Sequence, residues 1–232
     1  MASLLLGGGA AQVSGCLEDL SSRRVNIVHV RRPGAAAPAG VPAARLVSAP
    51  RREVAVVAAS PEPAIAHLVA GVVDPGLQAQ VAADLAAAAA AFAQHVGADH
   101  VRAKLELVTA QSCPRWHSDS VRLRLLVTYA GGGGTWFVGN AHVRRAPRRA
   151  GWPWPGGWPG GWPGGAAAPG VLGVDERHAV QAGAGDLLYL KGNAAPGLAG
   201  AGAVHRSPAL DDADPLAARL LLTVDDACCG AG

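Results

Sequence analysis

A histidine and an aspartate stand two residues apart in the middle of the chain, at a spacing that suits metal binding. They are His117 and Asp119, within CPRWHSDSVRLRLLVTY at residues 113–129. Apolar residues alternate along the second half of this stretch, which predicts a β-strand. On an extended strand, residues i and i+2 point to the same side, so the two side chains would lie together. A third ligand, His205, is available far downstream in VHRSP.

Two histidines and one carboxylate on one face of a metal leave other coordination positions open. This is the arrangement of the non-haem Fe(II) oxygenases, in which substrate or oxygen must reach the metal. A His-x-Asp triplet alone also fits a capping or turn aspartate beside a surface histidine. Arg219, which stands 14 positions after His205, supports the metal hypothesis. A planar guanidinium pairs with a carboxylate through two parallel hydrogen bonds, so Arg219 could anchor an acidic cosubstrate.

Four blocks of the sequence resemble a bacterial and algal family that is catalogued as domain of unknown function 1826. The blocks are CPRWHSDSVRLRLLVTY, GDLLYLKG, VHRSP and RLLLTVD. The resemblance covers most of the chain from about residue 18, apart from a Trp-Pro-Gly insertion. The family looks similar to the cupin-like, double-stranded β-helix oxygenases, and it is associated with zinc-responsive genes.

The resemblance implies a mainly β fold with a flanking helix (α+β), built as an antiparallel jelly-roll or double-stranded β-helix barrel. It implies that His117, Asp119 and His205 hold Fe(II). It also implies that Arg219 binds the far carboxylate of 2-oxoglutarate as a cosubstrate. The implied function is a metal-dependent dioxygenase, with an unknown small molecule or protein as its substrate.

Two alternatives stay open. The same three ligands could hold Zn(II) in a non-catalytic, zinc-handling module. Arg219 would then face solvent or pair with one of three acidic residues that precede it, Asp211, Asp212 and Asp214. A third reading is a cupin-type enzyme that uses its metal without 2-oxoglutarate.

Further residues are expected to surround the site or to line its pocket: Thr128, Tyr129, Trp136, Lys191 and Arg206. Trp136 fits the barrel core equally well. Cys113 is expected to be a small buried residue rather than a ligand. The other histidines have no carboxylate at ligand spacing inside a resembling block, and we expect them at surface or packing positions: His29, His67, His95, His100, His142 and His178.

Composition excludes several function classes. The 232 residues suffice for one domain with a sizeable core, and 31 Gly with 17 Pro favour turns and short strands. A net charge of +3 is too small to indicate nucleic-acid binding. The four cysteines lack the paired spacing of a zinc ribbon and suit a reducing compartment.

Hydrophobic periodicity predicts about eight short strands joined in antiparallel jelly-roll manner, with one helix packed outside the sheet. The helix is expected at 76–97, where apolar residues recur at helical spacing and Gly97 can end it. Strands are expected at 25–30, 54–57, 101–109, 121–129, 135–138 and 187–192, around His205, and from Arg219 onward.

The expected organisation is a variable segment at 1–17, one cupin-like domain at 18–227 and a tail at 228–232. A Trp-Pro-Gly repeat at 151–165 is expected to be an irregular insertion in this domain. The sequence contains no run of 18 or more apolar residues without helix breakers, so no membrane span is predicted. The predicted location is the cytoplasm, with a plastid or another organelle as the alternative. A homodimer is compatible with this class of barrel.

Overall fold

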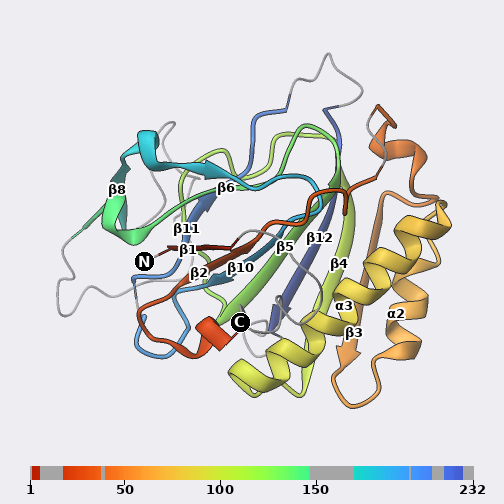
Figure 1. The fold of residues 1–232 in the computed structure, drawn as a ribbon, viewed down its shortest axis with the longest axis horizontal. Helices are drawn as coiled ribbons and strands as arrows, with labels where there is room; N and C mark the ends of the chain where they lie inside the picture. Colours follow the sequence, from red (N-terminus) through yellow and green to blue (C-terminus); the bar gives the residue numbers. More distant parts are fainter. Residues whose placement is uncertain are drawn as a thin grey trace, which may run out of the picture.

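The computed structural model has a mainly antiparallel β architecture with two α-helices (Figure 1). The structure describes residues 2–5, 18–37, 40–146, 170–198, 200–210 and 217–226. The Trp-Pro-Gly repeat at 151–165 lies outside these ranges. The division into a segment at 1–17, a domain at 18–227 and a tail therefore stays a prediction.

The larger sheet has seven strands in the order β1-β2-β10-β5-β12-β4-β3. Every pair in it is antiparallel except β1 with β2, which run parallel. Along the chain these strands are β1 (Ala2–Leu5), β2 (Ile27–Val30), β3 (Arg51–Val57), β4 (His100–Val108), β5 (Leu123–Ala130), β10 (Leu187–Lys191) and β12 (Arg219–Asp226).

The smaller sheet has three antiparallel strands, in the order β11-β6-β9. They are β6 (Trp136–Val138), β9 (Val180–Gln181) and β11 (Val204–Arg206). An isolated bridge between His117 and His205 adds the segment around His117 beside β11. A separate two-stranded pair consists of β7 (Val143–Arg145) and β8 (Val171–Val174).

From β4 onward the chain passes repeatedly between the two main sheets, with β6 and β9 both in the smaller one. It passes from β4 to the His117 segment, to β5, to β6 and, after the β7–β8 pair, to β9, β10, β11 and β12. A hydrophobic cluster fills the space between the sheets. Ile27, Leu126, Leu188 and Leu190 come to it from the larger sheet and Phe137 from the smaller one.

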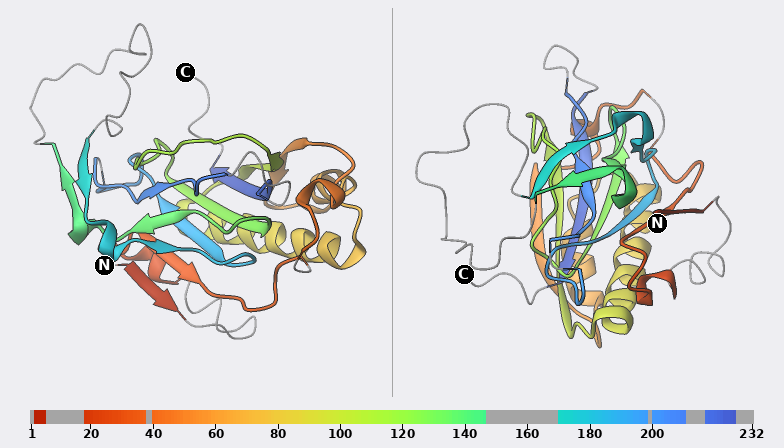
Figure 2. Two further views of the ribbon diagram at one scale, coloured as in Figure 1. Left: turned by 90° about the horizontal axis from the view of Figure 1, so that it is seen from above. Right: turned by 90° about the vertical axis from the view of Figure 1, so that its left-hand side faces the viewer.

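The second face of the larger sheet is covered by α2 (Glu62–Val69) and α3 (Pro75–Val96), and α3 lies along this face in both views of Figure 2. Asp74 begins α3 by accepting a hydrogen bond from the Leu77 N–H, and Gly97 ends it in the left-handed conformation. The helix predicted at 76–97 is thus confirmed, whereas α2 was missed. By length and composition alone, α3 could also cross a membrane, but about half of its apolar window is buried against the protein.

Short 3-10 helices join several elements, and two of them, η3 and η4, flank the β7–β8 pair. They are η1 (Asp19–Ser21), η2 (Ala43–Arg45), η3 (Asn140–His142) and η4 (Glu176–His178). The Trp116, Val138, Val171 and Val204 side chains form a small cluster on the outer face of the smaller sheet. The β7–β8 pair is therefore packed on that outer face.

A buried polar network ties α3 to the larger sheet. Asp84 of α3 accepts a hydrogen bond of 2.7 Å from the Tyr129 hydroxyl and one of 2.8 Å from Arg32 Nη2. Burial, together with the charge of Asp84, raises the pKa of Tyr129 well above its usual value, so the hydroxyl stays protonated and donates. The carboxylate in the helix–sheet interface is thus neutralised and hydrogen-bonded.

We expect Tyr129→Phe to lower the free energy of unfolding by about 1.5–3 kcal/mol, the value of a hydrogen bond to a charged group. Urea denaturation measures the change. Tyr189→Phe is the matched control, because Tyr189 is also buried on this face but its hydroxyl forms no hydrogen bond with a described residue. Equal losses in the two variants would contradict the proposed role of the network.

Candidate metal centre

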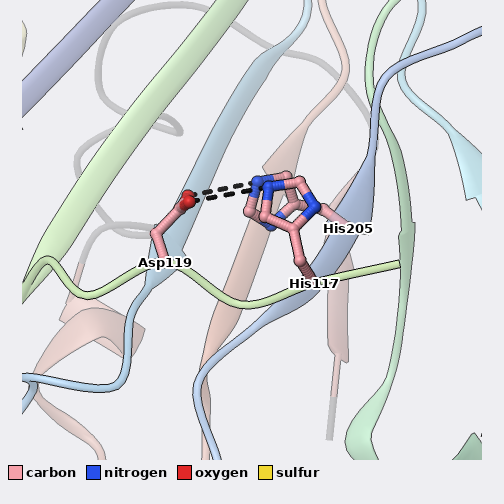
Figure 3. Close-up of side chains that lie close together, drawn as sticks. All are labelled: His117, Asp119 and His205. Carbon is pink, nitrogen blue, oxygen red and sulfur yellow. Dashed lines mark ion pairs between the residues drawn. The ribbon is translucent and has the colours of Figure 1, made fainter. Parts of the chain in front are cut away.

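Two side chains that stand two residues apart, His117 and Asp119, converge with the distant His205 between the two sheets (Figure 3). One ligand atom from each of His117, Asp119 and His205 lies within 4.8 Å of the others. The Asp119 carboxylate is 3.1 Å from His205 Nε2 and 3.6 Å from His117 Nε2. His205 is nearly buried, and the other two side chains are 17–18% exposed, so the group can be reached from solvent.

The backbone holds the two histidines side by side. His205 lies in β11, and its main chain exchanges two hydrogen bonds with that of His117, of 3.0 and 2.9 Å. The predicted strand over 121–129 begins only at Leu123, so His117 and Asp119 stand in an irregular segment before it. The expectation of a regular strand was therefore wrong at the ligands, which are aligned by the bridge to His205.

Both imidazoles are oriented by main-chain carbonyls. The Nδ1 atom of His117 lies 2.9 Å from the Arg115 carbonyl, and that of His205 lies 3.4 Å from the Ala203 carbonyl. A Nδ1–H that donates to a carbonyl leaves the lone pair on Nε2, which is the atom that faces Asp119 in both cases. The two rings therefore present their free nitrogens to one point.

Arg124 fixes the carboxylate. Its Nη1 donates to Asp119 Oδ2 at 2.6 Å, while Nε and Nη2 donate to the two oxygens of Asp225 at 2.6 and 2.7 Å. Burial by itself raises the pKa of Asp119, but His205, Arg124 and His117 outweigh it and hold this pKa well below its usual value. Asp119 is therefore an ionised oxygen ligand at neutral pH.

The donor set fits a divalent transition metal. Two neutral imidazole nitrogens and one carboxylate oxygen bind Fe(II) in the two-histidine, one-carboxylate sites, and the same donors bind Zn(II). The Nδ1 contacts and the Arg124 bridge are the outer hydrogen bonds that orient such ligands in known metal sites. The residues present thus fit a metal without rearrangement of their neighbours.

Arg219 is a buried cation without a hydrogen-bond partner among the described residues. It is the first residue of β12, is 1% exposed, and none of its three guanidinium nitrogens is hydrogen-bonded within the described part of the chain. Leu220 and Leu222 pack toward the helices, so alternation turns Arg219 to the interior between the sheets. Burial lowers the pKa of Arg219. The acidic residues Asp211, Asp212 and Asp214 lie outside the described residues.

Thr128 adds a second unpaired polar group to the same interior. Its hydroxyl is buried without a partner among the described residues, and Thr128 stands opposite Leu221 in the β5–β12 register. Leu221 and Arg219 alternate with Leu220 along β12, so Thr128 and Arg219 face the same interior, with a β-bulge in the register between them. A guanidinium and a hydroxyl are both groups that can donate a hydrogen bond to a carboxylate.

Gly131 makes this juxtaposition possible at the end of β5. It has a φ of +102°, and a Cβ there would lie 2.2 Å from the Ala218 carbonyl oxygen and 2.9 Å from Arg219 Cα. Only glycine allows the end of β5 to pass so close to the beginning of β12. The position of Arg219 thus depends on a residue far from it in sequence.

Four of the five predicted surrounding residues point away from the interior. On β5 and β10, Leu126 and Leu190 face the interior, so Tyr129 and Lys191 face the helices. Tyr129 donates to Asp84, and Lys191 Nζ donates to the Ser22 carbonyl at 2.7 Å. The structure therefore places neither in the pocket where the sequence put it.

Trp136 and Arg206 lie on the outer face of the smaller sheet, because their strand neighbours Phe137 and His205 face inward. The Arg206 guanidinium stacks 4.6 Å above the Trp116 ring and 5.9 Å from the Trp136 ring. Among the five, Thr128 alone faces the interior. Cys113 is exposed beside His117, not buried as expected, and its contact with His117 lowers the thiol pKa.

Sequence reasoning missed Arg124 and Asp225, although both stand inside resembling blocks. The sequence does show a charged residue within each of two largely apolar segments, but only the strand register places them opposite each other. It also missed that His29 is buried and lies 2.8 Å from the Asp186 carboxylate, a contact between segments far apart in sequence. Pairing of this kind follows from the strand order, which a single sequence does not reveal.

Gly192→Ala should disturb the ligand segment directly. A Cβ at Gly192 would lie 2.2 Å from the Val121 carbonyl oxygen and 2.7 Å from that of Asp119. We expect a loss of about 1–3 kcal/mol in unfolding free energy, as for overpacking elsewhere, and weaker metal binding. Gly132→Ala is the control, because a Cβ there meets nothing within 4 Å. A tolerated Gly192→Ala, by urea denaturation and metal titration, would show that this close approach is not needed.

Comparison with solved structures finds oxygenases at low identity. The rice dioxygenase for auxin oxidation is 12% identical, with a TM-score of 0.42 over 97% of this chain and 83% of that chain. The Arabidopsis thaliana dioxygenase for auxin oxidation 1, in a complex with 2-oxoglutarate, gives the same identity and TM-score over 97% and 92% of the two chains. A Pseudomonas putida prolyl-4-hydroxylase is 15% identical, with a TM-score of 0.39 over 92% and 97%.

No curated protein matches the chain. A family model does, and it covers residues 12–225, which is nearly the whole chain and includes all three ligand candidates and Arg219. Its description is "Protein of unknown function (DUF1826)". The chain therefore belongs to the DUF1826 family.

Proposed function

We propose that this protein is a metal-dependent oxygenase of the non-haem Fe(II)/2-oxoglutarate type. His117, Asp119 and His205 would hold the iron, and Arg219 with Thr128 would hold the far carboxylate of 2-oxoglutarate. The observation that carries the proposal is the guanidinium of Arg219, which is buried in the same interior as the triad and has no partner in the described part of the chain. A metal site alone explains the triad but gives no reason for this buried cation.

The cost of the free cation supports a ligand. Removing a charge from water without a partner costs several kcal/mol, and proteins keep such groups where a ligand completes them. Arginine gives a dicarboxylate two parallel hydrogen bonds, and the Thr128 hydroxyl can add a third. The apolar residues around them, including Leu126, Leu188 and Phe137, exclude water and strengthen these bonds.

The residues around the proposed metal and cosubstrate have distinct tasks. Bound Fe(II) would supply oxygen activation at its open coordination positions. The carbonyls of Arg115 and Ala203 hold the two imidazoles in the tautomer that offers Nε2. Arg124 keeps Asp119 ionised and in place. Arg219 and Thr128 orient the cosubstrate from its far end.

We also propose that the core is a double-stranded β-helix. The repeated passage of the chain between the two sheets from β4 to β12 supports this, as does the placement of the His117 segment beside β11. His205 and Phe137 of the smaller sheet both face the larger one.

Arg219→Met should separate a functional arginine from a structural one. We expect the ligand-free variant to be about 1–3 kcal/mol more stable in urea denaturation, because an unsatisfied buried group is removed. The same variant should bind 2-oxoglutarate at least about tenfold more weakly in calorimetry of the metal-loaded protein, since charge-assisted hydrogen bonds are lost.

Arg102→Met is the control, since this side chain is half exposed and forms only a long ion pair with Glu53. It should leave 2-oxoglutarate binding unchanged. A destabilised Arg219→Met variant would mean that this arginine has a structural partner. Metal-loaded protein that binds no 2-oxoglutarate in any form would leave the zinc-handling alternative, which uses the same three donors.

A further inference from the structure

A second group of two histidines and one aspartate lies on the β7–β8 pair. It consists of His142, the last residue of η3, with Asp175 and His178, which cap and end η4. One ligand atom from each lies within 4.8 Å of the others. Asp175 Oδ2 is 3.1 Å from His178 Nδ1, and the rings of His142 and His178 stack at 3.7 Å and 6°.

The main chain fixes these three residues relative to one another. Val143 pairs with Val174 in the β7–β8 register, which places His142 beside Asp175. The Asp175 N–H donates to the His142 carbonyl at 2.9 Å, and the His178 N–H donates to the Asp175 carbonyl at 3.1 Å. The backbone of these residues is therefore ordered before an ion binds, and the nearly parallel imidazoles need only turn about their side-chain torsions to direct their nitrogens at one ion.

A hollow of about 460 Å³ adjoins this group and provides access for an ion and its water. His142, Arg144, Gly173 and Asp175 are among its lining residues. His178 is half exposed, so the group faces solvent and not the interior that holds the first triad. Two imidazoles and one carboxylate leave at least one coordination position for water in a four-coordinate site.

We propose that His142, Asp175 and His178 form a second site for a divalent transition metal of the zinc class. Imidazole nitrogen with carboxylate oxygen is a donor set for zinc and its neighbours, and the neutral imidazole is the form that binds. An ion bound there cross-links the two strands at one end of the pair, where β7 begins and β8 ends. The site does not depend on the proposed oxygenase activity.

Arg177 competes with the ion for the carboxylate. Its Nε and Nη2 lie 3.0 Å from the two oxygens of Asp175, although the arginine side chain is 86% exposed. An exposed ion pair is weak and can be displaced by a dication. Removal of Arg177 should therefore tighten metal binding, which is the opposite of what loss of a merely structural contact would do.

The test counts zinc on the full-length, chelator-stripped protein after dialysis against buffered zinc, by elemental analysis. His142→Ala/His178→Ala should bind one zinc fewer than the natural chain, and so should His117→Ala/His205→Ala. The four substitutions combined should lose two. Thiols elsewhere in the chain also bind zinc, so the difference from the natural chain is the readout. His100→Ala, at an exposed position outside both groups, should lose none.

Two milder variants keep the test valid if the double variant does not fold. Asp175→Asn preserves the side-chain cap of η4 but weakens the oxygen donor, and we expect at least about tenfold weaker zinc binding at this site. Arg177→Gln should bind zinc about two- to fivefold more tightly, the factor for removal of a surface ion pair.

The proposal is overturned if the folded His142→Ala/His178→Ala variant keeps the full zinc content, or if Asp175→Asn and Arg177→Gln leave affinity unchanged. A loss confined to His117→Ala/His205→Ala would place all specific zinc in the first triad. If only the His142→Ala/His178→Ala variant loses zinc, the second site binds and the first triad does not. That result would count against the oxygenase proposal and not against the second site.

Discussion

The bridge that Arg124 forms between Asp119 and Asp225 is the interaction on which the first metal centre depends. Asp119 stands in an irregular segment, and no regular strand holds it. Arg124 and Asp225 are paired positions of two central strands, so the bridge transfers the rigidity of the larger sheet to a loop ligand. Buried charges of both signs must be paired to be tolerated, and here the pairing also keeps the metal-binding carboxylate ionised. The histidines need less support, because backbone hydrogen bonds already align them.

Arg219 differs from Arg124, because the described residues do not pair its charge. It faces the same interior, yet the described residues leave its guanidinium without a hydrogen bond, and the nearby Thr128 hydroxyl is equally unpaired. A fold gains nothing from a buried cation that its own residues leave unsatisfied, so the simplest physical explanation is a ligand that completes it. Under the proposed function a short dicarboxylate would meet both requirements of the interior, with one end at the metal and the other paired with arginine. The ligand-free protein would then be less stable than one with an apolar residue at this position.

The sequence was informative where local pattern decides. The helix at 76–97, the strand that begins at Arg219 and the mainly antiparallel β class all follow from periodicity and capping residues. The sequence was less informative where the structure depends on which strands pair or on the sheet face to which a strand residue points. Tyr129 and Lys191 were placed in the pocket although alternation against Leu126 and Leu190 turns them to the helices. The grouping of His142 with Asp175 and His178 arises only when β7 pairs with β8, across a long stretch of sequence. Asp175 stands three residues before His178, but this spacing lies outside the resembling blocks, and His178 was expected at a surface or packing position.

The measurement that tests the central claim most directly is visible absorption of the anaerobic protein loaded with Fe(II), before and after addition of 2-oxoglutarate. The account predicts a metal-to-ligand charge-transfer band that appears with 2-oxoglutarate and is absent from His117→Ala, which lacks a ligand of the first triad. Because His142, Asp175 and His178 are intact in His117→Ala, loss of the band in this variant assigns it to the first triad and not to iron bound at the second group. Tight zinc binding with no band under any condition would contradict the oxygenase account and favour a metal-handling protein.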